Sequence, residues 1–185
     1  LLAHLGGAWD NALFQGVQAM SMRDVSAWRA EAVGLFSGLF AECAVAAVKD
    51  PRLCQLLEFW LSIFADCGYA KDAIFLVHVL RDPVEAALSQ RNRAVDDPLF
   101  YEVGRELEEG AALWLSLTAQ ALEQSLDGNN FYVSYAAMLS EPAITLDTMA
   151  DFIGLQPDVR RVETFCADFV TPALHRSIAN DTLNT

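Results

Sequence analysis

Arg81 and Ser89 are the two residues whose types and spacing best fit a phosphate-binding site. Arg81 directly follows the apolar run 73–80, AIFLVHVL, and precedes D-P-V-E, a pattern typical of a helix N-terminus. A guanidinium at this point lies beside the backbone N–H groups that open the helix, and its planar donors match phosphate oxygens in pairs. Ser89 follows about two turns into the helix, on a face that can turn back to the same pocket. The alternative is an arginine paired with Asp82 or Glu85 and a solvated serine.

Lys49 and Tyr135 occupy comparable positions, each at the end of a predicted strand. The strands are 44–48, AVAAV, which stops at Lys-Asp-Pro, and 131–135, FYVSY. In an open parallel sheet, ligands bind beyond the carboxyl ends of the strands. The sequence therefore predicts Lys49, Arg81 and Tyr135 along one edge of the sheet. The alternatives are a lysine neutralised by the aspartate that follows it and a tyrosine that closes a core strand.

The order of the predicted elements is typical of an α/β fold with a parallel sheet. Strand, helix, strand, long helix, strand, helix is the alternation expected when helices connect parallel strands, with right-handed crossovers. The run 73–80 is almost wholly apolar, so helices should cover both faces of the sheet. A chain of 185 residues fits a single domain, 1–185. Besides the helix after Arg81, the helices expected are 24–43, 52–68, 101–126, 142–154 and 158–169.

Composition and charge restrict the classes of partner. The chain is 54% hydrophobic and 20% charged, as in ordinary globular proteins, and its net charge is −13 with a pI near 4.4. Such a surface repels nucleic acid and anionic membranes, so neither is an expected partner. The apolar runs are shorter than the ~18 residues of a membrane helix, and no signal peptide opens the sequence. We therefore expect a soluble, cytoplasmic protein of unassigned oligomeric state.

The cysteines and histidines do not form a metal-binding pattern. No CxxC pair occurs and the three histidines are scattered singly, so no metal site is predicted. In the cytoplasm we expect reduced thiols that pack as small buried side chains. His78, inside the run 73–80, is expected to be a hydrogen-bonded core histidine rather than a catalytic base. The cysteines are Cys43, Cys54, Cys67 and Cys166.

Three stretches of the sequence together resemble the sulfotransferase family. In LRDPVEAALSQRNR a strand ends in Arg-Asp-Pro and a helix supplies a serine eight residues after the arginine, as in that family's 3′-phosphate-binding motif. VKDPRLCQLLEFW, 48–60, is similar to the segment of bacterial and protein-tyrosine sulfotransferases whose lysine touches the transferring sulfuryl group. FYVSYAAMLSEPAITLDTMADFIGL, 131–155, is similar to a late family pattern with a tyrosine near the adenine, although alanines replace the usual acidic residues after it.

The resemblance implies a function and a set of residues. The protein would transfer a sulfuryl group from 3′-phosphoadenosine 5′-phosphosulfate (PAPS) to a hydroxyl or amine of a small-molecule or saccharide acceptor, without a metal ion. Arg81 and Ser89 would hold the 3′-phosphate, and Tyr135 would border the adenine. Arg176, in PALHRS, falls where the family has a basic segment near the same phosphate. Lys49 would be the catalytic residue that stabilises charge on the bridging oxygen and the sulfuryl group.

The family's phosphosulfate-binding loop does not occur in the sequence. There is no G-x-x-x-x-G-K-[ST], and LLAHLGGAWDN resembles a stretch downstream of that loop. The resemblance therefore implies a three-layer, P-loop NTPase-like architecture whose N-terminal part is missing, with these residues as the C-terminal portion of a longer domain. The alternatives are a nucleotide-dependent kinase of the same fold and a non-catalytic remnant that binds a nucleotide or serves in assembly.

Overall fold

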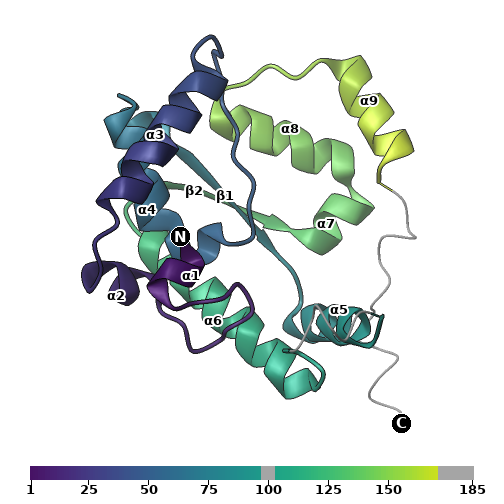
Figure 1. The fold of residues 1–185 in the computed structure, drawn as a ribbon. Coiled ribbons are helices and arrows are strands. Elements are labelled where there is room, and N and C mark those ends of the chain that lie inside the picture. The colour runs from purple at the N-terminus through teal and green to yellow at the C-terminus, as the bar shows by residue number, and fades with distance from the viewer. Residues whose placement is uncertain (97–102, 171–185) are drawn as a thin grey trace. The chain divides into compact units, whose positions relative to one another are not determined.

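A computed structural model describes residues 1–96 and 103–170 (Figure 1). The chain forms two compact units, which are described separately. The first comprises Leu1–Ile74 and Ala112–Gly128, and the second comprises Phe75–Ala111 and the residues from Asn129 onward. The fold is α/β, with mostly helices and a two-stranded parallel sheet in the described part of the chain. The coarse fold class expected from the sequence is therefore confirmed.

The first unit is helical, and the predicted helices 24–43 and 52–68 are present with shorter ends. A 3-10 turn, η1, precedes the second unit, and most of the long helix α6 belongs to the first. Two short N-terminal helices, α1 and α2, were not predicted. The elements are α1 (Leu2–Leu5), α2 (Gly16–Ser21), α3 (Ser26–Phe40), α4 (Leu53–Asp66), η1 (Lys71–Ala73) and α6 (Leu107–Ser125).

The core of the first unit lies where α3 and α4 pack against the N-terminal segment. Phe36 of α3 contacts Phe40 and Phe64 through ring pairs with centroids 4.7 and 5.2 Å apart. Ring pairs at such separations stabilise packing beyond simple burial. The buried core residues are Leu5, Phe14, Phe36, Leu56, Phe59 and Ile63.

The prediction of a strand at 44–48 is wrong. These residues have no regular secondary structure and precede α4 as a loop. Ala46 and Val48 pack against the core whereas Val45 is exposed. Burial therefore alternates between these residues as it would in a strand, although they form none. The physical reason is that a strand needs a neighbour for its backbone groups, and within the described residues β1 and β2 pair only with each other.

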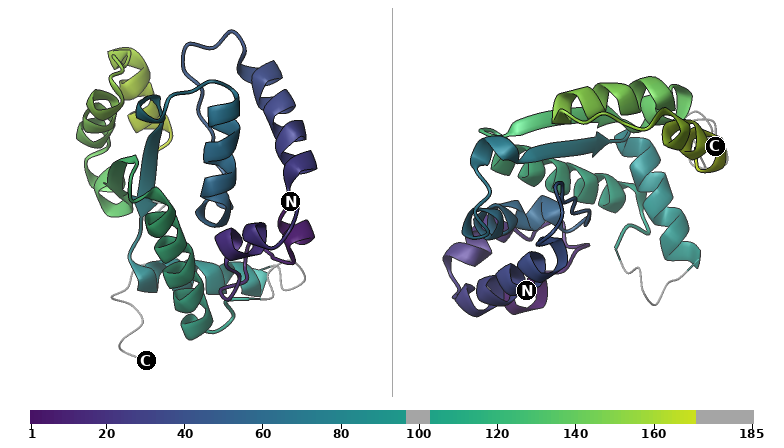
Figure 2. Two further views of the ribbon diagram at one scale, coloured as in Figure 1. Left: turned by 90° about the vertical axis from the view of Figure 1, so that its left-hand side faces the viewer. Right: turned by 90° about the horizontal axis from the view of Figure 1, so that it is seen from above.

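The second unit contains both strands, and the strands predicted at 73–80 and 131–135 are present. The strands β1 (Phe75–Leu80) and β2 (Asn129–Ser134) are parallel, in a register that runs from Phe75 opposite Asn129 to Leu80 opposite Ser134. The helices are α5 (Pro83–Asp96), α7 (Tyr135–Ser140), α8 (Pro142–Ile153) and α9 (Val159–Asp168). Figures 1 and 2 show the strands side by side, with α5 following β1 and α7 following β2.

One face of the sheet packs against α8. Phe152 of α8 lies edge-on to Phe75 at 5.5 Å and stacks on Phe131 at 5.2 Å, measured between ring centroids. On the same face Phe75, Val77 and Val79 are all exposed, Val79 to 62%, so the expectation that helices cover both faces of the sheet is wrong along β1. The second edge of β1 has no strand partner among the described residues.

The other sheet face carries polar groups that satisfy each other. His78 Nε2 lies 2.9 Å from Asn130 Oδ1, and its ring stacks on Tyr132 with centroids 5.1 Å apart. His78 is therefore hydrogen-bonded, as expected for a histidine within a strand.

The described helices and thiols add two findings. Among residues 1–96 and 103–170, no helix combines the length and apolar character needed to cross a membrane. All four cysteines are free thiols, but Cys43 is exposed, so the expectation of buried cysteines is wrong there. Burial raises the pKa of the Cys54 thiol, which disfavours its reactive thiolate form.

Candidate anion site at the ends of the two strands

Arg81 lies directly after β1 and before α5, as the sequence predicted. Its side chain is mostly buried, and its Nε donates to Glu85 Oε2 at 3.4 Å, four residues along the chain. Of the two acidic partners weighed from the sequence, the structure shows Glu85. The guanidinium is thereby fixed at the start of α5 instead of extending into solvent.

Asp82 caps α5. Its Oδ1 accepts hydrogen bonds from the backbone N–H groups of Val84 at 2.9 Å and Glu85 at 3.1 Å. Pro83 has no N–H, so the donors of the first turn are occupied or absent. The backbone N–H groups that we expected to be available beside Arg81 therefore already donate to the Asp82 side chain. Positive charge for an anion at this position must come from the guanidinium.

Tyr135 meets Arg81 because of the register of the parallel strands. Leu80 and Ser134 are opposite each other, so the residue that follows each strand emerges at the same end of the sheet. The centre of the Arg81 guanidinium lies over the Tyr135 ring, 4.8 Å from its centroid. At this distance the guanidinium cation is attracted by the negatively polarised face of the ring. Tyr135 is the first residue of α7, not the last residue of the strand as predicted.

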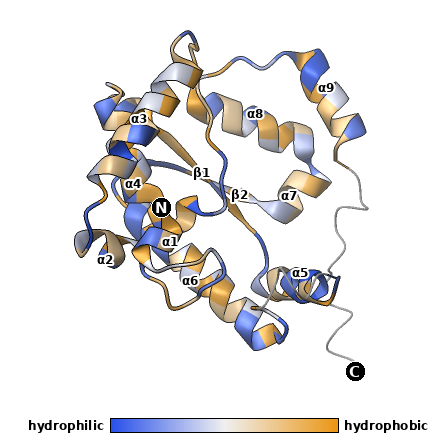
Figure 3. Ribbon diagram, viewed as in Figure 1, coloured by the Kyte–Doolittle hydropathy of each residue, from blue (hydrophilic) through white to orange (hydrophobic). Residues whose placement is uncertain are grey.

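Ser89 lies on the same face of α5 as Glu85. Residues four apart on a helix are neighbours, so Ser89 is one turn beyond Glu85, which itself contacts Arg81. Ser89 is half-buried. Ala87 and Leu88 of α5 are buried, and Figure 3 shows hydrophilic residues over much of the rest of the helix.

Lys49 belongs to the first unit, whereas Arg81, Ser89 and Tyr135 belong to the second. Lys49 is exposed in the loop before α4. The neighbouring Asp50 forms an ion pair with Arg52 and accepts the Arg52 backbone N–H at 2.8 Å. The Arg52 hydrogen bond lowers the pKa of the Asp50 carboxyl, with a smaller contribution from Lys49. Asp50 is thus engaged mainly by Arg52, contrary to the alternative in which it neutralises the lysine.

Arg176, the remaining predicted donor-binding residue, lies outside the described residues.

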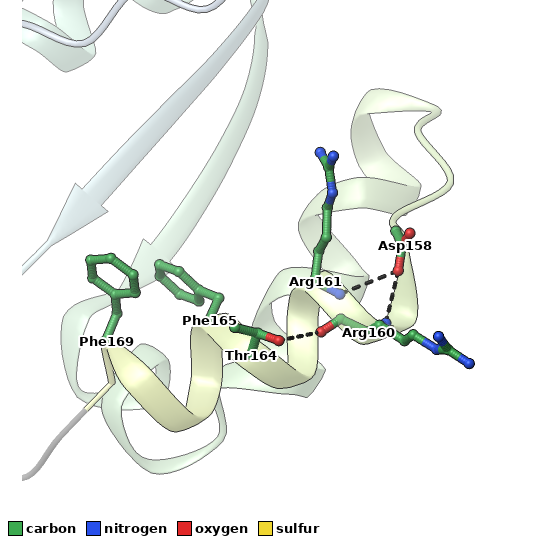
Figure 4. A pocket seen from close by; sticks show the side chains of 6 residues that line it. All are labelled: Asp158, Arg160, Arg161, Thr164, Phe165 and Phe169. Atoms are coloured by element: carbon green, nitrogen blue, oxygen red, sulfur yellow. Dashed lines mark hydrogen bonds between the residues drawn. The ribbon is translucent and has the colours of Figure 1, made fainter.

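Two shallow hollows of about 300 and 320 Å³ lie along α9, away from these positions. Arg160 and Arg161 border the first, and Figure 4 shows their side chains pointing in different directions. Two divergent guanidinium groups do not converge on one anion. Neither hollow is lined by Arg81, Ser89 or Tyr135.

Sequence reasoning placed the partners of two contacts near each other but did not specify the contacts themselves. The contact between Arg81 and Tyr135 follows from the register of the two strands. Its signal in the sequence was the prediction that both residues lie at the same edge of the sheet. The choice of Glu85 over Asp82 was signalled only by the four-residue spacing from Arg81, which is a weak preference on its own.

Comparison with known proteins found no family model that matches the chain, and no match among curated proteins or solved structures.

Proposed function

We propose that this chain is the 3′-phosphate-binding part of a PAPS-dependent sulfotransferase. The observation that carries the proposal is the meeting of Arg81 and Tyr135 at adjacent carboxyl ends of two parallel strands, with Ser89 on the helix that follows. Ligands bind at this edge in open α/β sheets. The three sequence motifs, in the order of the sulfotransferase family, add a specific ligand to this general position.

Each residue has a distinct part in the proposal. The Arg81 guanidinium binds the 3′-phosphate through charge-assisted hydrogen bonds, and Ser89 donates its hydroxyl to the same group. Tyr135 contacts one side of the Arg81 guanidinium with its ring face, and the edge of the same ring lies beside the adenine. Lys49 supports charge on the bridging oxygen as the sulfuryl group moves in line to a hydroxyl or amine acceptor, and Arg176 adds positive charge near the phosphate.

The proposal includes a larger sheet of the three-layer, P-loop NTPase type. A two-stranded sheet is too small to be stable alone, and parallel strands are normally buried inside larger sheets. Among the described residues β1 has no strand partner at its second edge, where a further strand would add, and the face with the exposed Val79 is one that a further helix would cover. In this proposal the phosphosulfate-binding loop and the catalytic base are not among these 185 residues.

Calorimetric titration with two nucleotides tests the proposal. The 185-residue chain should bind adenosine 3′,5′-bisphosphate more tightly than ADP, and Arg81→Ala should remove that preference. Loss of a mostly buried charge-assisted contact should weaken bisphosphate binding by about 2–3 kcal/mol, roughly 30- to 150-fold. Arg160→Ala removes an exposed arginine of α9 and should bind like the unmodified chain.

Two results would contradict this function. Equal binding of both nucleotides, or a preference for ADP, would favour the nucleotide-dependent kinase. Full retention of bisphosphate binding by Arg81→Ala would show that the ligand binds elsewhere.

A further inference from the structure

Arg81 and Glu85 present a cation and a hydrogen-bond acceptor side by side. The two side chains are only 20% and 13% exposed, and their Nε–Oε2 distance is 3.4 Å. The Tyr135 ring covers one side of the guanidinium. A ligand bound to this arginine therefore also meets the Glu85 carboxylate, and its chemistry must suit both groups.

Phosphate and sulfate esters differ in the property to which a carboxylate responds. A phosphate monoester has a second pKa near 6, so it can keep one O–H while its other oxygens remain anionic. A sulfate ester has no proton to donate near neutral pH, so all its free oxygens are acceptors. Opposite Glu85, the phosphate forms an O–H···O hydrogen bond, whereas the sulfate places two acceptors against each other.

We propose that Glu85 makes the Arg81 site select a phosphate monoester over a sulfate ester. The inference rests on the proposed function, in which the donor carries a phosphate at one end and a sulfate at the other. Glu85 then fixes the direction in which the donor binds, because only its 3′-phosphate suits the pair. One proton is held between Glu85 and the bound phosphate, so binding above pH 6 takes up a proton from solution.

Charged groups occur next to Glu85 on its own helix and on the helix that packs against it. Arg81 faces it from the end of β1, and Asp82 caps the same helix turn. The first turn of α6 packs against α5, where Gly110 approaches Ala87. That turn carries two acidic residues, Glu108 and Glu109, and Glu109 accepts a hydrogen bond from the Gly104 backbone N–H at 3.1 Å. Among these groups Arg81 is the cation that pairs with Glu85, and a phosphate bound to Arg81 brings its O–H to the Glu85 carboxylate.

The experiment compares adenosine 3′-phosphate with adenosine 3′-sulfate by calorimetry at pH 7.5, in two buffers of different ionisation enthalpy. The unmodified chain should prefer the phosphate ester by at least about tenfold and take up about one proton with it. Glu85→Gln should reduce the preference to about twofold or less and abolish the proton uptake, because the amide can also donate to sulfate. Glu85→Asp keeps a carboxylate and should retain part of the preference. Glu163→Gln, an exposed change on α9, is the matched control and should behave like the unmodified chain.

The possible outcomes separate the inference from the proposed function. If Glu85→Gln keeps the original preference or proton uptake while Arg81→Ala loses binding, the selecting role of Glu85 is refuted and the anion site remains. If Arg81→Ala binds both esters as tightly as the unmodified chain, the proposed function fails, and the inference fails with it. Binding of neither ester by any of the proteins would refute both.

Discussion

Gln124 is inserted into the hydrogen-bond ladder of α4, and replacing it should destabilise the first unit. Its Nε2 donates to Cys54 O at 2.9 Å and its Oε1 accepts from Glu58 N at 3.1 Å. These two backbone groups are four residues apart and would bond to each other in a regular helix. Leu56, between them, has non-helical angles of φ −128° and ψ 19°. The inserted amide thus explains the kink in the helix that follows the Lys49 loop.

Gln124→Met preserves the length of the side chain and removes both hydrogen-bonding groups. Loss of the hydrogen bond to the half-buried Cys54 carbonyl should then destabilise the fold by about 1–2 kcal/mol. Loss of the bond from the Glu58 N–H, which belongs to an exposed residue, should destabilise it by less than about 1 kcal/mol. We expect a total loss of about 2 kcal/mol in the free energy of unfolding, or about 4–8 °C in Tm for a chain of this length. Denaturant titration followed by tryptophan fluorescence measures the change, with Trp60 of α4 as a local reporter.

Glu123→Met is the matched control, because Glu123 is an exposed neighbour on the same helix. It should change the unfolding free energy by less than about 0.5 kcal/mol. If Gln124→Met is no more destabilising than this control, α4 can form its own Cys54–Glu58 hydrogen bond. The kink would then have another cause.

Two further predictions concern a close contact and a carboxylate. A Cβ on Gly16 would lie 1.7 Å from the backbone oxygen of Gln55, so Gly16→Ala should lower the free energy of unfolding by more than about 2 kcal/mol. Gly34 is inside α3 with open space around it, so Gly34→Ala should raise the free energy of unfolding by about 0.5–1 kcal/mol. Denaturant titration measures both changes. The hydrogen bond from Arg29 lowers the pKa of the Asp66 carboxyl below its unfolded value, so this pair stabilises the fold above the unfolded pKa and the contribution disappears as pH falls through the folded pKa. Asp66→Asn should therefore lose less stability between pH 7 and pH 3 than the unmodified chain.

The outcomes that contradict these predictions are specific. Equal effects of the two glycine substitutions would show that the backbone around Gly16 adjusts to a methyl group. An unchanged acid dependence in Asp66→Asn, measured by thermal unfolding at each pH, would show that the ion pair with Arg29 does not form in solution.

The part of the site that could be predicted from the sequence depends on the two strands. The runs 73–80 and 131–135 are rich in β-branched and aromatic residues, and each finds the other as a partner. Once two parallel strands are paired, the residues after them must lie close together. The proximity of Arg81 and Tyr135 therefore followed from local pattern and one topological rule.

The remainder required contacts that local pattern does not specify. The run 44–48 has the composition of a strand, yet strand formation depends on a partner elsewhere in the chain, and none is present among the described residues. The kink in α4 depends on Gln124, which is distant in sequence and has no special motif around it. Arg81 had two acidic candidates within four residues, and only side-chain geometry selects Glu85.

The most direct test of the central claim is the side-chain NMR signal of Arg81. The Nε–H resonance can be assigned by its loss in Arg81→Ala and followed during titration with adenosine 3′,5′-bisphosphate and, separately, adenosine 5′-phosphate. If Arg81 binds the 3′-phosphate, its resonance shifts with the bisphosphate at a concentration where the 5′-phosphate leaves it unchanged. Equal shifts with both nucleotides, or none with the bisphosphate while other resonances move, would contradict the assignment of this site.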